Sequence, residues 1–413
     1  MKQELLTFPI TKVREQFPAL KRTYKEKTVT YLDGPGGTQV VASSVQAIKE
    51  YMEKGGANLH GSFPTSYETE EIIADARNII ADLFGVKARE VAFGANMTTL
   101  ALSVGRALGK TINKGDEIVV TEIDHRANVD PWISMAEDRG ATVRWLKVDP
   151  ESLTLNLDNL HEVINEKTKL VAVGLASNAV GTINNVKRIA ERAREAGALT
   201  AVDAVHAAPH IAIDRNKLGA DILLCSAYKF FGPHVGIAVI KENVFEQLDP
   251  FKLQPAPDYL PDKLETGTQN HEGIAGIKPA VEFVEKLGEG ADRRERILAG
   301  MAIIEEYENS LADKMREGLR TISNVKLYEA APDVPKTPTI AFTVEGMNSR
   351  DVCKRIAEEH GIFTADGHFY ATTLAGKLDI NDKGGWVRAG LAPYNTAEEV
   401  EAFIQAVEGV IKG

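Results

Sequence analysis

Short apolar runs alternate with amphipathic stretches along the first two thirds of the chain. Residues 57–69 are too polar and too broken to be regular, which predicts a loop; over residues 70–85 apolar side chains fall on one helical face, which predicts a helix packed on a core. The apolar runs predict buried strands at residues 28–33, 90–93, 117–121, 142–148, 170–175, 199–202, 222–225 and 235–240. Strands alternating with helices predict an α/β fold whose mostly parallel sheet is covered on both faces. In such a sheet, ligands bind at the carboxyl ends of the strands.

The pattern changes after Gly290. The elements expected there are a long amphipathic helix at 294–319, strands at 325–328, 339–344 and 386–391, a helix at 349–360, a loop at 365–385 and a helix begun by the capping box Thr396–Glu399. This arrangement predicts a smaller α+β unit over the rim of the larger one. Since the chain is longer than one core usually serves, we expect an N-terminal arm (1–26) packing on the small domain, a large domain (27–288) with the ligand site at its strand ends, and a small C-terminal domain (289–413).

Composition excludes several classes of protein. The 413 residues carry a net charge of -11 and no dense basic run, which disfavours nucleic-acid and anionic-membrane surfaces. No apolar stretch approaches transmembrane length, and the N-terminus lacks the apolar core of a signal peptide. Two cysteines, Cys225 and Cys353, cannot make a disulfide framework or a zinc site, so we expect a cytoplasmic protein without a metal centre.

The candidate nucleophile is Lys229. The strands 222–225 and 235–240 are predicted to be joined by a tight turn at Gly232-Pro233, with Lys229 at the lip between them. Its neighbours Tyr228, Phe230 and Phe231 are aromatic, and desolvation among them favours the neutral amine that attacks a carbonyl carbon. The alternative is a surface lysine whose stem lies over the rings.

Other polar residues follow predicted strands and are expected on the same rim. Gly94–Thr99 places small and hydroxyl residues where a strand meets a helix, which suits a phosphate as well as an ordinary N-cap. Asp203 could keep a pyridine nitrogen protonated or simply cap a helix, and His125 could stack on a ring or be a hydrogen-bonded loop histidine. With Lys229, these groups fit one cofactor, pyridoxal 5′-phosphate.

Motifs along nearly the whole chain resemble one group of the class V aminotransferases, the cysteine desulfurases and selenocysteine lyases. The motifs that carry the resemblance are, in chain order, Tyr31–Asp33, Ala57–His60, Asp124–Trp132, Ser177–Thr182, Val202–Asp203 with His206, Ser226–Lys229 with Gly232 and Pro233, Glu265–Thr268 and Arg388–Asn395. The resemblance implies a fold type I pyridoxal phosphate enzyme. Its large domain is expected to hold a mostly parallel seven-stranded sheet, and two copies are expected to form a homodimer with shared active sites.

The resemblance also implies roles for individual residues. Lys229 would bond the cofactor's aldehyde and Asp203 would pair with the pyridine nitrogen. His125, the second catalytic candidate, would stack on the ring, and His206 would contact the ring hydroxyl. The remaining cofactor and substrate contacts implied are Met97, Thr98, Ser226 and Tyr228 around the phosphate, Thr268 on the neighbouring subunit's phosphate, Asn178 near the cofactor, Arg388 on the substrate carboxylate, and His60 with Tyr370 around the substrate side chain.

One departure from the family bears on the reaction. Desulfurases of this group carry a nucleophilic cysteine in a loop, and the corresponding run here is Ala365–Ala371, with Tyr370 at the cysteine position. A phenol cannot accept sulfur as a persulfide. We therefore expect an enzyme that cleaves the C–S or C–Se bond of a small L-amino acid without a persulfide-forming cysteine. An epimerase or aminotransferase and a non-catalytic sulfur-transfer scaffold are the alternatives, and the sequence identifies no sulfur-acceptor protein.

Overall fold

A seven-stranded sheet forms the larger layer of the molecule. The structure, a computed structural model, describes residues 8–412. The strand order is β4-β12-β11-β10-β9-β5-β6, and β12 runs antiparallel to both neighbours while every other adjacent pair is parallel. The strands are β4 (Val91–Gly94), β5 (Glu117–Thr121), β6 (Thr142–Leu146), β9 (Thr168–Gly174), β10 (Leu199–Asp203), β11 (Ile222–Ser226) and β12 (Gly236–Ile240). The predicted mostly parallel sheet is confirmed.

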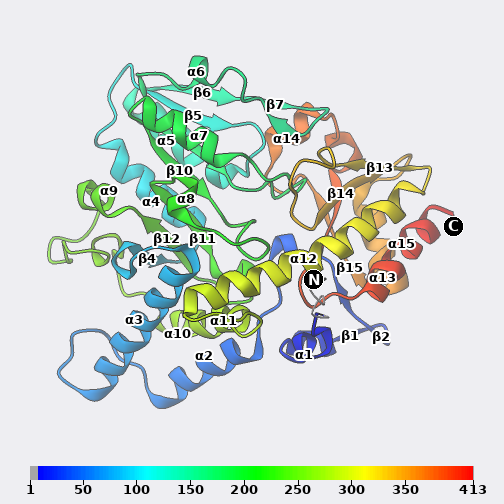
Figure 1. Cartoon of the computed structure of the whole chain (residues 1–413), viewed down its shortest axis with the longest axis horizontal. Helices are drawn as coiled ribbons and strands as arrows, with labels where there is room; N and C mark the ends of the chain where they lie inside the picture. Colours follow the sequence, from blue (N-terminus) through cyan, green and yellow to red (C-terminus); the bar gives the residue numbers. More distant parts are fainter. Residues whose placement is uncertain (1–7, 413) are drawn as a thin grey trace.

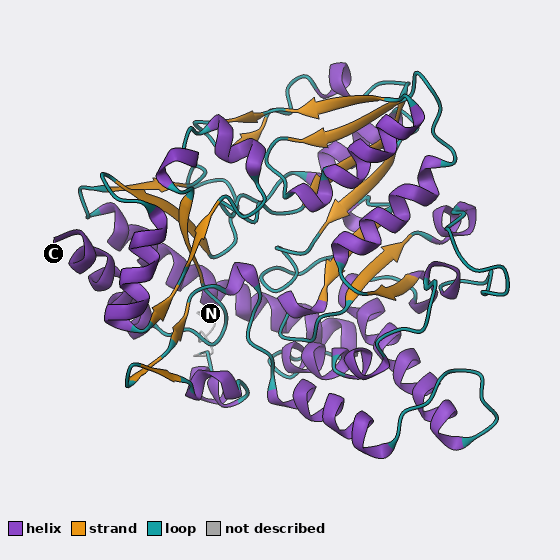
Figure 2. Ribbon diagram, turned by 180° about the vertical axis from the view of Figure 1, so that it is seen from behind, coloured by secondary structure: helices purple, strands orange, loops and turns teal. Residues whose placement is uncertain are grey.

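Alternation along each strand sends side chains to two separate cores. Ile222 and Leu224 of β11 pack with the helices α4 (Met97–Gly109) and α5 (Asp130–Arg139) on one face. Leu223 of the same strand joins a second core on the opposite face. The helices of that second core include α3 (Pro64–Phe84), α7 (Val186–Glu195) and α11 (Ile277–Glu285). Figure 2 shows helices on both sides of the strands. Because both faces are covered, the strands are continuous apolar runs.

A second, four-stranded sheet lies beside the first. Its order is β13-β14-β17-β16, with all adjacent pairs antiparallel. The strands are β13 (Val325–Tyr328), β14 (Thr339–Val344), β16 (Ala365–Gly367) and β17 (Trp386–Gly390). The helices α12 (Arg293–Arg320), α13 (Ser349–His360) and α15 (Ala397–Lys412) close its core. The predicted capping box of α15 is confirmed, because Glu399 N–H donates to Thr396 Oγ1 and Thr396 N–H donates to the Glu399 carboxylate, each over 3.2 Å.

Helix α12 joins the two sheets. Figure 1 shows it running from α11 towards β13 and α15. Its first turn is tied to the large-sheet side, because Arg294 donates to the carbonyls of Asp82 and Ile213. A boundary between residues 288 and 289 therefore stays a prediction. The predicted arm, 1–26, has residues 1–7 outside the described part of the chain; its α1 (Ile10–Glu15) holds Arg14, which donates to Tyr394 O over 2.6 Å.

Two predicted loops are partly regular. The loop expected over 57–69 ends early because α3 begins at Pro64, which suits the first turn of a helix. The polar residues Ser66 and Thr69 are buried within the first turns of α3: the Thr69 hydroxyl donates to the Thr65 carbonyl inside the helix, and the Ser66 hydroxyl donates to the Asn58 carbonyl and so ties the preceding loop to the helix. The loop expected over 365–385 contains β16 and α14 (Thr372–Lys377), whose apolar residues pack into the core.

Three strand and turn predictions are also corrected. The strand expected at 28–33 is reduced to β3 (Thr30–Tyr31), which pairs with β15 (Ile362–Phe363) rather than with the large sheet. The strand expected at 142–148 ends at Leu146, and β7 (Val148–Asp149) instead pairs antiparallel with β8 (Thr154–Leu155). The tight turn expected at Gly232-Pro233 is only part of a longer connection over 227–235, which begins with a 3-10 turn at Ala227–Lys229. No helix among residues 8–412 is long and apolar enough to cross a membrane.

Candidate active site

A cavity of about 560 Å³ lies at the carboxyl ends of the large-sheet strands, where it meets β17 and the loop after β16. Of the thirteen site residues predicted from the sequence, eleven line it: Met97, Thr98, His125, Asn178, Asp203, His206, Ser226, Tyr228, Lys229, Tyr370 and Arg388. Lining residues that sequence reasoning missed include Asn96, Asp124, Val205, His234 and Phe369. The predicted gathering of these residues at the carboxyl ends of the strands is therefore observed.

The sheet order, which the sequence does not reveal, determines where each group lies. Ser226 ends β11 and Asp203 ends its neighbour β10. Asn178 follows β9, and His125 follows β5, farther along the same rim. Met97 follows β4 on the opposite side of β12. The phosphate candidates thus lie towards one end of the cavity and His125 towards the other.

The N-terminus of α4 offers an anion site at the first end. Asn96 caps the helix by accepting the N–H of Thr99 over 2.9 Å. The N–H of Met97 donates to Ser226 Oγ over 2.9 Å, which leaves the Ser226 hydroxyl hydrogen free to donate to an anion. Gly236 makes this approach possible, because a Cβ there would lie 2.5 Å from the Asn96 backbone. The predicted N-cap is confirmed, and it leaves room for the phosphate site, which stays a prediction.

Lys229 occupies the wall of the cavity rather than the outer surface. Its Nζ donates to the Pro35 carbonyl and lies 5.1 Å from the centroid of the Tyr228 ring, which itself stacks on His234 at 4.7 Å. Burial lowers the pKa of the amine to about 7, and the positive charge of Arg388 acts in the same direction. A substantial neutral fraction is thus present at physiological pH, as a nucleophile or base requires.

Two carboxylates lie beyond the lysine, that of Asp124 buried and that of Asp203 partly buried. Asp203 accepts the Val205 N–H over 2.8 Å, and burial raises the pKa of its carboxyl to about 6. Asp124 accepts the Gly174 N–H over 2.7 Å, and burial raises the pKa of its carboxyl to about 7. Asp203 is followed by a turn rather than a helix, so the alternative prediction that it caps a helix is wrong. A cationic partner would stabilise the ionised form of either acid.

The protonation of His125 follows from its contacts. Its Nδ1 accepts the Ala127 N–H over 2.9 Å, so in the neutral ring the proton is on Nε2. Burial lowers the pKa of the imidazole to about 4, with the charges of Lys229 and Arg388 adding to the effect. The ring is tilted by 32° against Tyr370, at a centroid distance of 5.2 Å. His125 is therefore a neutral ring on one side of the cavity.

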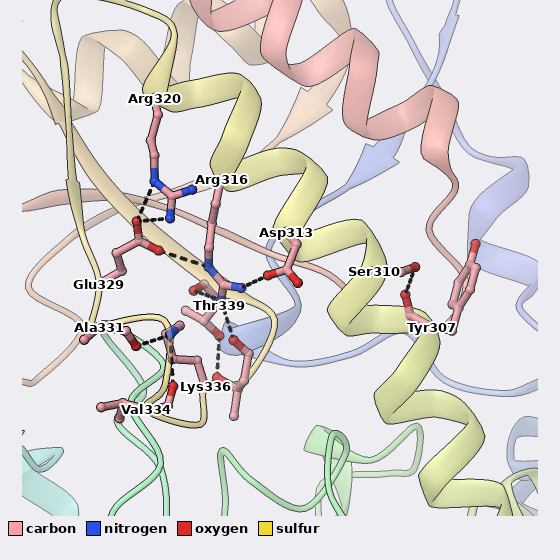
Figure 3. A network of polar contacts seen from close by, with 11 residues as sticks. Tyr307, Ser310, Asp313, Arg316, Arg320, Glu329, Ala331, Val334, Lys336 and Thr339 are labelled. Carbon is pink, nitrogen blue, oxygen red and sulfur yellow. Dashed lines mark hydrogen bonds and ion pairs between the residues drawn. The ribbon is translucent and has the colours of Figure 1, made fainter.

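A polar network behind His206 connects the cavity to α12. His206 Nε2 lies 3.1 Å from Thr337 Oγ1 and 2.9 Å from Thr339 Oγ1, and burial lowers the pKa of the ring. Arg316 of α12 donates to the Thr337 carbonyl over 2.9 Å. Figure 3 shows Arg316 between Thr339 and the carboxylates that neutralise it, Asp313 and Glu329. His206 is thus held by the smaller sheet as well as by the rim.

His60 and Thr268 do not line this cavity. His60 is exposed, has a left-handed backbone (φ 67°) and donates its N–H to Glu70. Thr268 is exposed on the loop before α10 (His271–Ala275). Thr268 was expected to reach the neighbouring subunit's phosphate, and His60 to lie around the substrate side chain with Tyr370; the structure does not place His60 beside Tyr370 in this cavity, and both roles stay predictions.

The residues present fit pyridoxal 5′-phosphate. A phosphate would have the α4 N-terminus and Ser226, an aldehyde would have the amine of Lys229, and a pyridine nitrogen would have the carboxylate of Asp203. Buried atoms without a hydrogen-bond partner among residues 8–412 include Asn178 Oδ1 and Arg388 Nε at the cavity wall. Buried polar atoms without a protein partner are expected where a bound ligand supplies the missing hydrogen bond.

Comparisons with known proteins agree with this geometry. An aminotransferase-like protein of Gibberella zeae is 34% identical over 98% of this chain and 99% of its own, and a probable cysteine desulfurase of Synechocystis is 30% identical over 97% and 95%. A cysteine desulfurase structure from Thermococcus onnurineus is 29% identical, covers 98% of both chains and has a TM-score of 0.88. The family profile described as "Aminotransferase class-V" matches residues 30–403. The chain therefore belongs to the class-V aminotransferases and is a pyridoxal 5′-phosphate-dependent enzyme of fold type I.

Proposed function

We propose that the enzyme cleaves the Cβ–S or Cβ–Se bond of a small L-amino acid without forming a persulfide on the protein. The observation that carries the proposal is that both cysteines are buried away from the cavity. Cys225 is fully buried in β11 and Cys353 is buried on α13, and neither lines the cavity. Burial raises the pKa of both thiols, that of Cys353 to about 12, so neither is a ready nucleophile.

The chain's own groups supply the remaining requirements. The bound cofactor withdraws electrons from the substrate Cα, which makes the Cα–H bond acidic and a β-substituent labile. Lys229 Nζ would take the Cα proton, and Asp203 would hold a proton at the pyridine nitrogen. The Arg388 guanidinium would bind the substrate carboxylate, for which a planar pair of N–H donors is suited. His125, neutral and protonated on Nε2, would cover one face of the ring.

Electron balance determines the products. A desulfurase that forms alanine must pass sulfur, without its bonding electron pair, to a nucleophile. With Tyr370 at the position of that nucleophile, the sulfur would instead leave with the bonding pair as sulfide and take up a proton. Water would then release the three-carbon fragment as pyruvate and ammonium. No oxidant or reductant is consumed, and no sulfur-acceptor protein is needed for turnover.

A substrate panel tests the proposal. The holoenzyme would be incubated with L-cysteine, cysteine sulfinate, selenocysteine and S-substituted cysteines in D₂O, followed by mass spectrometry of the products. From cysteine, selenocysteine and S-substituted cysteines we expect sulfide, selenide or a thiol, each with pyruvate. From cysteine sulfinate we expect sulfite with alanine, because SO₂ leaves without the bonding pair and needs no acceptor thiol. Deuterium at Cα without sulfur or selenium release would favour an epimerase instead, and a keto acid with retained sulfur would favour an aminotransferase. A protein with no visible cofactor band, unchanged in Lys229→Ala, would support the scaffold alternative.

We also propose a cytoplasmic homodimer with shared sites. Phe63 and Tyr67 are large exposed side chains that follow His60 in the chain, and the exposed Phe251 lines a surface hollow together with Thr266. Exposed apolar groups of this size favour a covering partner. Sedimentation of the wild-type chain would give its mass in solution. Thr268→Ala should weaken cofactor retention if Thr268 reaches the partner's phosphate site.

A further inference from the structure

The loop after β16 has an unusual backbone. Phe369 and Tyr370 both have positive φ, 50° and 57°, a conformation that non-glycine residues seldom adopt. Two hydrogen bonds hold the loop in place: Asn178 Nδ2 donates to the Phe369 carbonyl over 2.8 Å, and the Arg126 N–H donates to the Tyr370 carbonyl over 2.9 Å. Backbone strain that persists in this way is found where the surroundings require a particular side-chain direction.

The strained backbone brings the ring of Phe369 against Arg388. The guanidinium carbon lies 3.7 Å from the ring centroid, and the same ring stacks on Trp386 at 6.4 Å with an interplanar angle of 16°. Arg388 Nη1 donates to the Asn178 carbonyl over 2.7 Å. Arg388, Asn178 and Phe369 therefore form a cluster in which each residue contacts the other two.

An aromatic face suits an arginine that must bind a carboxylate. A ring attracts the cation through its quadrupole and accepts none of the in-plane hydrogen bonds of the guanidinium. A carboxylate in the same place would occupy the N–H donors that a substrate carboxylate needs. Arg388 is buried, and its Nε has no hydrogen-bond partner among residues 8–412, so donors remain for a ligand.

We propose that Phe369 is a positioning residue for the substrate carboxylate: its ring orients Arg388 and its carbonyl fixes Asn178, so that the free N–H edge of Arg388 faces the cavity. The inference rests on the proposed binding of the carboxylate by Arg388. It assigns the loop 368–371 a function that does not depend on a cysteine at position 370.

The test compares two amines that differ only in the carboxylate. L-Alanine and ethylamine would be titrated into the holoenzyme, with binding followed by the change in the cofactor's visible absorbance. In Phe369→Leu we expect roughly tenfold weaker binding of L-alanine and unchanged binding of ethylamine, the size of effect typical of a buried cation–π contact. Phe369→Tyr, which keeps the ring, should bind both ligands as the parent does. Phe8→Leu is the matched control, because it removes a ring stacked at 3.8 Å on Tyr307 by the same substitution.

The outcomes separate this inference from the proposal on which it rests. If Arg388→Gln abolishes the preference for L-alanine but Phe369→Leu retains it, the positioning role is wrong and the carboxylate site stands. If Arg388→Gln retains the preference, Arg388 is not the carboxylate site and both ideas fail. Equal weakening of both ligands in Phe369→Leu would indicate a general structural effect and would also overturn the inference. Thermal unfolding of each variant would establish that the proteins compared are folded.

Discussion

The amine of Lys229 is expected to react as a neutral nucleophile at physiological pH even before the cofactor binds. Burial and Arg388 lower its pKa from 10.5 to about 7. At pH 7 about half of the amine is then neutral, against roughly 0.03% for a lysine with a pKa of 10.5, an enrichment on the order of a thousandfold. Reactivity towards a small aldehyde should rise about tenfold per pH unit below pH 7 and become constant above about pH 8.

Reductive methylation of the apoprotein with trace formaldehyde would measure this pH dependence. Labelling at each lysine would be quantified by mass spectrometry of peptides from pH 5 to 10, with the exposed Lys54 as internal reference. Two variants should shift the midpoint in opposite directions. Arg388→Gln removes a positive charge and should raise the midpoint, whereas Asp203→Asn removes the charge that favours the ammonium form and should lower it. Labelling of Lys229 that keeps climbing tenfold per unit beyond pH 9 would refute the reasoning.

Three further predictions concern other parts of the site. Asp203→Asn should retain bound cofactor but lose at least a hundredfold in kcat, because an amide does not stabilise a protonated pyridine; absorbance and steady-state kinetics would measure the two effects separately. Behind the cavity, Glu308→Ala leaves the buried His210 without its 2.8 Å partner and should cost about 2–3 kcal/mol in urea unfolding; an unchanged midpoint would show that this buried contact does not stabilise the fold. Tyr370→Cys places a thiol in the loop, and detection of alanine from L-cysteine by mass spectrometry, absent from the parent, is the expected gain.

Much of the rim was predictable because the chemistry follows apolar runs. Asp203 and Ser226 are the last residues of buried strands and Lys229 follows three residues later, and parallel strands bring such residues to one edge. Their order across the sheet was not predictable, since a run of apolar residues carries no information about which strand it pairs with. The beginning of α3 was misplaced for a related reason: the hydroxyls of Ser66 and Thr69 bond within the fold, and polarity alone suggested a loop.

The contacts around Arg388 could not be predicted from the sequence. Phe369 appears as one aromatic residue among others until the positive φ at positions 369 and 370 directs its ring. Asp124 lies in the motif Asp124–Trp132, in which only His125 was considered as a site residue. Its position just after a strand is the same signal that identified Asp203. Side-chain direction in a strained loop depends on tertiary hydrogen bonds, here those from Asn178 and Arg126.

The central claim is that this enzyme releases sulfur or selenium without a protein thiol, and a cysteine-free enzyme tests it most directly. Because the chain has two cysteines, the variant Cys225→Ala/Cys353→Ala removes every thiol. Products from L-cysteine and selenocysteine would be quantified for the parent and the variant. We predict equal release of sulfide or selenide, matched by pyruvate and ammonium. Loss of release in the folded variant, or alanine as the main product of the parent, would contradict the account.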